Sequence, residues 1–240
     1  MENFVGHKKF QRKISIVIPA HNEEKNIERS VTEIADSFRN AQIIVVCNGC
    51  TDRTYEIARG IKRPNVEVIN FHEHIGKGGA ILEGFKRADG NIVGFVDADG
   101  SFGIDEIKKI IENLKKYDAV IASKWKDKNF FEVQSSFTRK IGSRFWNFFV
   151  RLLTGIDFKD TQAGLKFFKR EVIDSILKED FICCGFDFDV ELLYKIKKMG
   201  FKIKEVYTPI KDSGKSTFNM RYSTKMFSKL LKFYFSKNKE

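Results

Sequence analysis

Two aspartates separated by a single residue are the clearest chemical signal in this sequence of 240 residues. Asp97 and Asp99 follow the apolar run 92–96, and alternate side chains of an extended chain point to the same side. Mg²⁺ and Mn²⁺ suit such a pair, because hard cations take one or two carboxylates and complete their shell with diphosphate oxygens. The pair therefore predicts a Mg²⁺ or Mn²⁺ site that neutralises a departing diphosphate. A solvated acidic turn is the alternative.

A glycine-rich segment earlier in the chain offers matching phosphate contacts. Residues 76–80 read GKGGA and open a predicted helix over 77–88. Free backbone N–H groups at a helix start, together with the cation of Lys77, form a natural cradle for phosphate. A tight strand-to-helix turn would also use these glycines. Beside the two aspartates, the segment indicates a diphosphate-bearing ligand at Lys77 and Gly78.

The elements that must position these residues alternate between strand and helix through the first half of the chain. Apolar, β-branched runs predict buried strands, and amphipathic spacing predicts helices between them. The predicted strands are 14–18, 43–46, 66–71, 92–96 and 119–123, and the predicted helices are one capped by Asn22 and those at 52–62, 77–88 and 105–116. This order indicates an α/β fold with a doubly wound, mostly parallel sheet and helices on both faces.

Ligands of such sheets bind beyond the carboxyl ends of the strands. Polar residues follow four of the predicted strands, namely His21, Asn22 and Glu23, then Asn48 and Gly49, then His72 and Glu73, then Asp97 and Asp99. The chemistry is therefore expected along that edge. The second half is less regular, with helices predicted over 130–153 and 190–199 and strands over 165–168 and 202–206. Because no repeat or linker divides the chain, it is predicted to form a single domain.

Six short motifs follow one another between residues 14 and 215. They are IVIPAHNE at 16–23, GKGGA at 76–80, DADG at 97–100, DTQAG at 160–164, FDVELL at 188–193 and GKS at 214–216. Their order and approximate spacing resemble the family 2 glycosyltransferases of the GT-A fold, especially the dolichyl- and polyprenyl-phosphate mannose and glucose synthases. The resemblance implies an inverting glycosyltransferase that moves a hexose from a UDP-glucose or GDP-mannose type donor to polyprenyl or dolichyl phosphate.

The resemblance also assigns the parts of the chain. It implies a nucleotide-sugar-binding half at about 14–123 and an acceptor-binding half at about 124–222, and the residue pattern adds a basic amphipathic helix at 223–240. Asp97 and Asp99 become the catalytic and metal-binding residues, and the donor site comprises Pro19, His21, Glu23, Asn48, Asp52, Lys77, Gly78 and Asp97. The family usually has an aspartate where Asn48 stands, and an amide donates as well as accepts hydrogen bonds. The base of the nucleotide is therefore left open.

Four basic residues are implied as the grip on the acceptor phosphate, namely Lys124, Arg139, Arg144 and Lys215. A phosphate acceptor is already an anion at neutral pH, so positioning and charge stabilisation would carry the reaction. A saccharide or glycolipid hydroxyl is the alternative acceptor and needs a base, for which Asp189 and Glu191 are the candidates. Each of these two also suits a capping or ion-pair role. A non-catalytic nucleotide-sugar-binding protein is the second alternative.

Two predicted helices carry basic residues beside many aromatic ones. Helical spacing relates Lys140, Arg144, Asn147 and Arg151 in the first, and Lys225, Lys229, Lys232 and Ser236 in the second. Helices of this kind lie in bilayer interfaces, where each basic residue contributes about 1 kcal/mol. Packing on the core, or a dimer contact for the second helix, is the alternative. The pattern predicts a cytoplasmic protein held peripherally at a membrane surface and leaves room for a separate membrane protein partner.

Composition adds limits to these predictions. The formal net charge of +11 suits an anionic partner, but no recognised nucleic-acid-binding motif accompanies it, so nucleic acid is not expected. No run approaches the ~18 apolar residues of a membrane span, and the N-terminal residues lack the apolar core of a secretory signal. The spacing of Cys47 and Cys50 leaves a redox or zinc role open beside an ordinary one.

Overall fold

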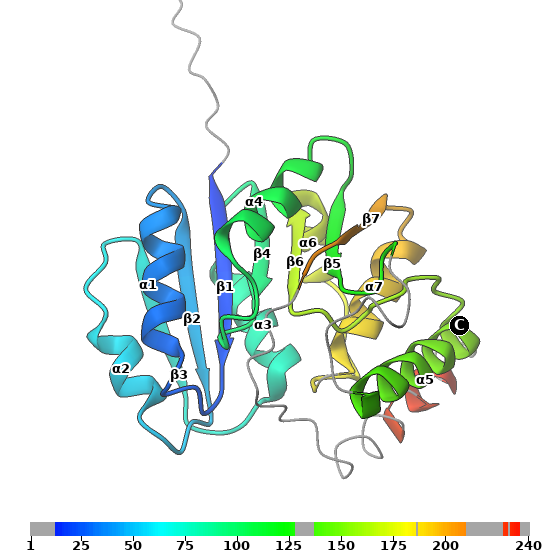
Figure 1. The fold of residues 1–240 in the computed structure, drawn as a ribbon, viewed down its shortest axis with the longest axis horizontal. Helices are drawn as coiled ribbons and strands as arrows, with labels where there is room; N and C mark the ends of the chain where they lie inside the picture. The colour runs from blue at the N-terminus through cyan, green and yellow to red at the C-terminus, as the bar shows by residue number, and fades with distance from the viewer. Residues whose placement is uncertain (1–12, 128–136, 186, 210–227, 230, 236–240) are drawn as a thin grey trace, which may run out of the picture.

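The computed structural model describes residues 13–127, 137–185, 187–209, 228–229 and 231–235, with the backbone alone at 137–139 and 143. Seven strands form one sheet in the order β3-β2-β1-β4-β6-β5-β7 (Figure 1). The strands are β1 Ile14–Ala20, β2 Gln42–Asn48, β3 Val66–Phe71, β4 Ile92–Val96, β5 Ala119–Ser123, β6 Leu165–Lys169 and β7 Ile203–Tyr207. All seven predicted strands are present, and their ends differ from the predicted ends by two residues or fewer.

Helices cover both faces of this sheet. They are α1 Ile27–Ser37, α2 Thr54–Gly60, α3 Gly76–Arg87, α4 Ile104–Asn113, α5 Phe137–Thr154, α6 Arg170–Ile176 and α7 Phe188–Lys198. Apolar side chains of α1, α2 and α4 form one core with the sheet, and those of α3, α6 and α7 form a second core on the opposite face. The predicted doubly wound α/β architecture is therefore confirmed, although α6 was not predicted.

Among the described strands, β6 alone runs antiparallel to its neighbours. It lies between β4 and β5 and runs antiparallel to both, while the other strand pairs are parallel. In this register Lys166 lies opposite Phe95 and Leu165 opposite Val96. The loop that precedes β6 is thereby brought against the residue that follows β4, which is Asp97.

The start of α1 differs from the prediction. Asn22 adopts a left-handed backbone conformation with φ of 56°, and its side-chain oxygen accepts a hydrogen bond from the backbone N–H of Thr51 at 2.8 Å. The helix begins at Ile27 instead, after a turn in which the Glu23 carbonyl accepts from the N–H groups of Asn26 and Ile27. Asn22 therefore joins two loops at the sheet edge and caps no helix.

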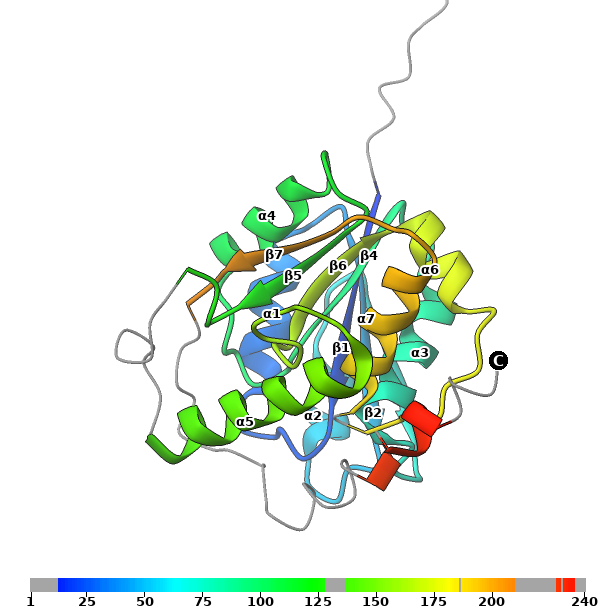
Figure 2. The ribbon, with the colours of Figure 1, turned by 90° about the vertical axis from the view of Figure 1, so that its right-hand side faces the viewer.

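Helix α5 lies beyond the edge of the sheet at which the parallel strands end, with the helical residues 228–229 and 231–235 beside it (Figures 1 and 2). Its inner face packs on α7 and on Phe233, with Trp146, Phe149 and Val150 directed into that small core. Within the described part of the chain, no helix combines the length and the hydropathy needed to cross a bilayer.

Candidate active site

Asp97 is held from both sides at the carboxyl end of β4. Its backbone N–H donates to the carbonyl oxygen of Gly164 at 2.8 Å, and its Oδ1 lies 2.7 Å from Nζ of Lys77. Burial disfavours a charged lysine, but the charges of Asp97, Asp189 and Asp99, together with the hydrogen bond to Asp97, outweigh burial and raise the pKa of Lys77. This ion pair places Lys77 and Asp97 side by side, as expected if both contact the same ligand.

Gly164 leaves no room for a side chain next to that carboxylate. A Cβ atom on Gly164 would lie 1.8 Å from Oδ2 of Asp97. The DTQAG motif therefore supplies a wall of bare backbone against which the Asp97 carboxylate packs. The sequence showed the motif, but its contact with Asp97 follows from the antiparallel register of β6.

Three carboxylates gather at this edge. Oδ1 of Asp99 accepts a hydrogen bond from the N–H of Ser101 at 2.9 Å. The pKa of Glu23 is raised by burial and further by the charges of Asp99 and Asp97, against a hydrogen bond from Asn26. No cluster of three or more metal-ligating side chains exists among the described residues. Two protein carboxylates fit Mg²⁺ or Mn²⁺ when the bound ligand supplies the remaining oxygens.

The glycines at the start of α3 serve packing more than the predicted phosphate cradle. The N–H of Gly78 donates to the carbonyl oxygen of Cys184 at 2.8 Å, so the predicted free amide is engaged. A Cβ atom at Gly76 would lie 2.2 Å from that same oxygen, and one at Gly78 would lie 2.5 Å from Phe188. Cys184 and Phe188, the first residue of α7, therefore approach α3 so closely that only glycine fits at both positions.

Asn48 ends β2 as the centre of a buried hydrogen-bond cluster. Its side-chain oxygen accepts from the N–H of Ile75 at 2.8 Å, and its backbone oxygen lies 2.7 Å from Nδ1 of His21 and 3.4 Å from Nδ1 of His74. The two imidazole rings lie 4.4 Å apart. His74 was not predicted as part of the site. Its position three residues before Lys77 could have indicated it.

The remaining predicted donor residues lie along the same edge. Asp52 accepts from the N–H of Thr54 at 3.0 Å and from that of Glu24 at 3.2 Å. Burial raises the pKa of Asp52, but hydrogen bonds, chiefly from Thr54, lower it by more. These contacts fix the turn before α2, so both carboxylate oxygens already have protein partners. Pro19 lies near the end of β1, opposite Val46 of β2.

Cys47 and Cys50 flank Asn48. Cys47 is fully buried, whereas Cys50 is partly exposed, and its sulfur lies 3.6 Å from the carbonyl oxygen of Ala20. A hydrogen bond from the Cys47 thiol lowers the pKa of Cys50 to about 6, with help from nearby backbone N–H groups and His21. Metal-ligating groups of three or more are absent from the described chain, so the zinc alternative has no support there.

Two of the four predicted acceptor residues meet over one indole ring. The guanidinium carbon of Arg144 lies 4.6 Å from the ring centroid of Trp125, and Nζ of Lys124 lies 5.9 Å from it. Trp125 itself is buried. The side chain of Arg139 and the whole of Lys215 lie outside the described residues. The structure therefore brings together a cation from the end of β5 and one from α5.

Both candidate bases are buried and engaged. Oδ1 of Asp189 lies 2.7 Å from Nζ of Lys166 in an ion pair with almost no solvent exposure. Glu191 accepts hydrogen bonds from the N–H groups of Ile182 and Cys183 at 3.0 and 2.7 Å. Burial raises the pKa of Glu191 against these hydrogen bonds. These contacts favour structural roles for both carboxylates over proton abstraction.

The outer face of α5 is apolar and exposed. Ile141, Phe145, Phe148 and Leu152 are between 50% and 68% exposed, and their spacing places them in one stripe. The basic stripe of Lys140, Arg144 and Arg151 lies about a quarter turn away by helix geometry. Asn147, predicted in that basic stripe, instead donates to the carbonyl oxygen of Lys159 at 2.6 Å. One face of α5 therefore packs on the core, as the core-packing alternative predicted, and the bilayer contact stays a prediction for the exposed face.

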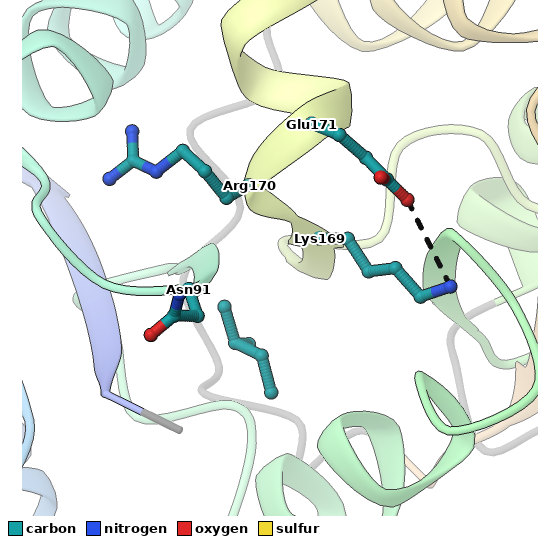
Figure 3. A pocket seen from close by; sticks show the side chains of 5 residues that line it. Asn91, Lys169, Arg170 and Glu171 are labelled. Carbon is teal, nitrogen blue, oxygen red and sulfur yellow. Dashed lines mark ion pairs between the residues drawn. The ribbon is translucent and has the colours of Figure 1, made fainter. Parts of the chain in front are cut away.

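A shallow pocket lies at the other edge of the sheet. It is lined by Asn91, Ile92, Lys169, Arg170 and Glu171, where β4 begins and β6 ends (Figure 3). Lys169 pairs with Asp118 at 2.7 Å and approaches Glu171 at 4.0 Å. Arg170 donates to the carbonyl oxygens of Gly90 and Ala88. Its charged groups thus hold the local structure, and the pocket shares no residue with the cluster around Asp97.

Known proteins resemble this chain in sequence. The family model described as Glycosyl transferase family 2 matches residues 15–177. The glycosyltransferase AglD of Haloferax volcanii is 30% identical over 202 residues, which cover 80% of this chain and 32% of that protein. The UDP-N-acetylglucosamine–dolichyl-phosphate N-acetylglucosaminyltransferase of Methanococcus voltae is 30% identical over 219 residues, covering 82% and 84%.

A third relative and a solved structure complete the comparison. The Drosophila melanogaster dolichyl-phosphate beta-glucosyltransferase is 28% identical over 217 residues, covering 80% of this chain and 65% of that protein. The chain thus spans about a third of AglD and about two thirds of the Drosophila relative. Glucosyl-3-phosphoglycerate synthase from Mycobacterium tuberculosis, in complex with Mn²⁺, UDP-glucose and phosphoglyceric acid, matches with a TM-score of 0.68 at 20% identity. It covers 93% of this chain and 80% of its own, which confirms the predicted fold.

Proposed function

Because the chain belongs to glycosyl transferase family 2, we propose that it transfers a hexose, with inversion, from a nucleoside-diphosphate sugar to polyprenyl or dolichyl phosphate. The observation that carries the acceptor assignment is the convergence of Arg144 and Lys124 on Trp125. Two cations on one rigid, buried platform suit a phosphate, because an arginine fork and a lysine point charge both bind its oxygens. The relatives from Methanococcus and Drosophila, both named for dolichyl phosphate, support this assignment.

The proposed donor site is the carboxyl edge of the sheet. Asp97 and Asp99 would hold Mg²⁺ or Mn²⁺, which when bound neutralises charge on the leaving diphosphate. Lys77 fixes the orientation of Asp97 through their ion pair. Pro19, His21, Glu23, Asn48 and Asp52 are proposed for the base and ribose. The solved neighbour with Mn²⁺ and UDP-glucose supports a uridine nucleotide and a divalent cation.

An anionic acceptor explains why no base is required. A lipid phosphate carries its own negative charge at neutral pH, so the protein needs to position it and to stabilise the departing diphosphate. Asp189 and Glu191, the candidate bases, are both buried in other contacts. A saccharide or glycolipid hydroxyl is the alternative acceptor, and it would require one of these carboxylates to be released.

We further propose that α5 rests on an anionic bilayer surface. The exposed apolar stripe lies beside the basic stripe, and this combination is typical of helices at bilayer interfaces. Arg144 belongs to α5, so a helix lying at the surface would place one phosphate-binding side chain at the height of the lipid headgroups. Aromatic and aliphatic side chains exposed to this degree are otherwise unfavourable in water.

A donor panel tests the reaction. Purified protein is incubated with Mn²⁺, polyprenyl phosphate in detergent and, in turn, UDP-glucose, GDP-mannose and UDP-N-acetylglucosamine, and mass spectrometry detects the lipid-linked sugar. We expect a product with one uridine donor, reduced by about 100-fold or more in Asp99→Asn. Nucleotide binding without any lipid-linked product would contradict the acceptor assignment. It would favour a different acceptor or the non-catalytic alternative.

A further inference from the structure

Lys166 is a fully buried lysine in the middle of the sheet. It lies on β6 directly opposite Phe95 of β4, and its side chain has no solvent exposure. Nζ donates to Oδ1 of Asp189 at 2.7 Å and to the carbonyl oxygen of Ala163 at 2.6 Å. A buried ammonium is unfavourable unless it is paired. The role of Lys166 is therefore to be sought in its two partners, Asp189 and Ala163.

One partner, Asp189, also acts on the donor side of the site. Lys77 and Lys166 both lie over the ring of Phe95, with their Nζ atoms 5.8 and 5.2 Å from its centroid. Asp189 is among the negative charges that act on Lys77, second only to Asp97. Lys77 is therefore paired with Asp97 and also feels the negative charge of Asp189.

The other partner, the carbonyl of Ala163, lies next to the wall behind Asp97. The adjacent residue, Gly164, accepts the backbone N–H of Asp97 at 2.8 Å and packs directly against its carboxylate. A hydrogen bond from Lys166 to residue 163 therefore fixes the loop that contacts Asp97. Lys166 thus contacts Ala163, the neighbour of Gly164, and Asp189, a carboxylate whose charge acts on Lys77.

We propose that Lys166 is a positioning residue for the donor site. Its charge holds Asp189 in place, which keeps Lys77 on Asp97, and its hydrogen bond holds the 163–164 backbone against the Asp97 carboxylate. The proposal rests on the proposed function only in that Lys77 and Asp97 contact the donor. It also makes Asp189 the counter-charge of Lys166, so the proton of an acceptor hydroxyl would have no base there.

Calorimetric binding of UDP and of GDP, each with Mn²⁺, tests the proposal without any lipid acceptor. In Lys166→Met, Asp189 loses its counter-charge and competes for Lys77, so we expect nucleotide affinity to fall by about 10- to 100-fold, as for loss of one charged hydrogen bond. The double variant Lys166→Met/Asp189→Leu removes both buried charges. We expect it to recover most of that loss, with the remainder reflecting the missing bond to Ala163.

Two controls separate positioning from folding. Lys169→Met removes another lysine of β6, partly exposed and paired with Asp118 at the opposite edge, and should leave nucleotide affinity unchanged. Circular dichroism melts show which variants are folded, and Lys166→Arg, which keeps the charge, should bind more tightly than Lys166→Met. A merely structural role would lower melting temperature without changing the nucleotide affinity of the folded fraction.

The outcomes also distinguish this proposal from the proposed function. The inference is overturned if folded Lys166→Met binds nucleotide like the wild type, if the folded double variant binds no better than Lys166→Met, or if the wild type binds neither nucleotide. Nucleotide binding that follows the expected order, without transfer to polyprenyl phosphate, would overturn only the acceptor assignment.

Discussion

The Asp97 carboxylate owes its position to neighbours that the motif around it does not contain. Lys77 comes from α3, and the Gly164 backbone comes from the loop before β6. Both contacts restrain a charged group beside the proposed diphosphate position. Preorganised charge of this kind stabilises a transition state without reorganisation during the reaction. The contact between Asp97 and Gly164 can be tested by replacing the glycine with alanine, which adds one methyl group.

Gly164→Ala should reduce transfer by about 100-fold, as misplacing a reacting group by about 1 Å does. Its Cβ atom would lie 1.8 Å from Oδ2 of Asp97, so the carboxylate must move. The matched control is Gly60→Ala, because no atom lies within 4 Å of a Cβ placed at the end of α2. Initial rates and melting temperatures check both variants. Wild-type activity in folded Gly164→Ala would contradict the importance of this contact.

Cys50 should react with iodoacetamide at neutral pH. Its pKa of about 6 makes the thiolate the main form above that pH, so the alkylation rate should rise through about pH 6 and then level off. Cys47→Ala removes the hydrogen-bond donor and should move the rise toward the ordinary value of 9.0. Peptide mass spectrometry at a series of pH values measures the rate at Cys50 alone. A rate that rises only above pH 8 in the unaltered protein would refute the lowered pKa.

The sequence indicated some site residues and missed others for definite reasons. Asp97 and Asp99 were identifiable because extended backbone places them on one side. The engagement of the Gly78 amide was not, because its partner Cys184 is remote in sequence. Lys166 sits in a segment that reads as an apolar strand, and its charge becomes meaningful only when α7 packs Asp189 against it.

At the scale of elements, helix α5 has three faces with different surroundings. One face packs on α7, one carries Arg144 toward Trp125, and one exposes large apolar side chains. A helix with a single buried face would show a continuous polar exterior. The bilayer proposal accounts for this exposed apolar stripe.

Replacing Phe145 and Phe148 with serine should weaken binding to anionic vesicles by about 100-fold. Each ring is about two-thirds exposed, and partial burial of two such rings in lipid contributes about 3 kcal/mol. Cosedimentation with vesicles containing phosphatidylserine measures the change. Met199→Ser is the control, since Met199 is 36% exposed and follows α7 at the edge where β7 begins. Equal vesicle binding by the double variant and the wild type would remove α5 from the membrane contact.

Strand and helix positions were largely predictable, whereas their pairing was not. Hydrophobic period and flanking polar residues located the strands within two residues. Nothing in the sequence of β6 shows that it runs antiparallel between β4 and β5, because a buried strand reads as an apolar run in either direction. The short helix α6 was missed because it follows β6 without a break, at Arg170.

At the scale of the described molecule, one sheet joins the proposed donor site to the proposed acceptor site. The proposed donor residues lie on or after β1 to β4, and β5 leads to Lys124 and Trp125, while β6 lies between β4 and β5. Because all of these strands share one hydrogen-bonded sheet, the spacing between donor and acceptor ends is fixed by backbone pairing. The predicted single domain remains a proposal for the chain as a whole.

Removing the positive charge of Arg144 or Lys124 should weaken binding of the acceptor without changing binding of the donor. Arg144→Gln and Lys124→Gln are each expected to raise the KM for polyprenyl phosphate by about 10-fold or more, because each loses a charged hydrogen bond to phosphate. The affinity for nucleotide should not change. Arg151→Gln is the matched control, since it also lies on α5 but pairs with Asp157. Steady-state kinetics at saturating donor measure the KM for polyprenyl phosphate, and calorimetry measures the nucleotide affinity. An unchanged KM, or a lowered nucleotide affinity, would contradict the assignment of these two cations to the acceptor.

The identity of the nucleophile is the central claim, and a matched pair of lipids tests it most directly. Wild-type protein is given the active nucleotide sugar, Mn²⁺ and either polyprenyl phosphate or the polyprenol of the same chain length, and the lipid-linked sugar is quantified by mass spectrometry. The account predicts a glycosyl phosphate from polyprenyl phosphate and no product above background from polyprenol, because both candidate bases, Asp189 and Glu191, are buried in other contacts. Equal or faster transfer to polyprenol, or to a soluble saccharide, would contradict it.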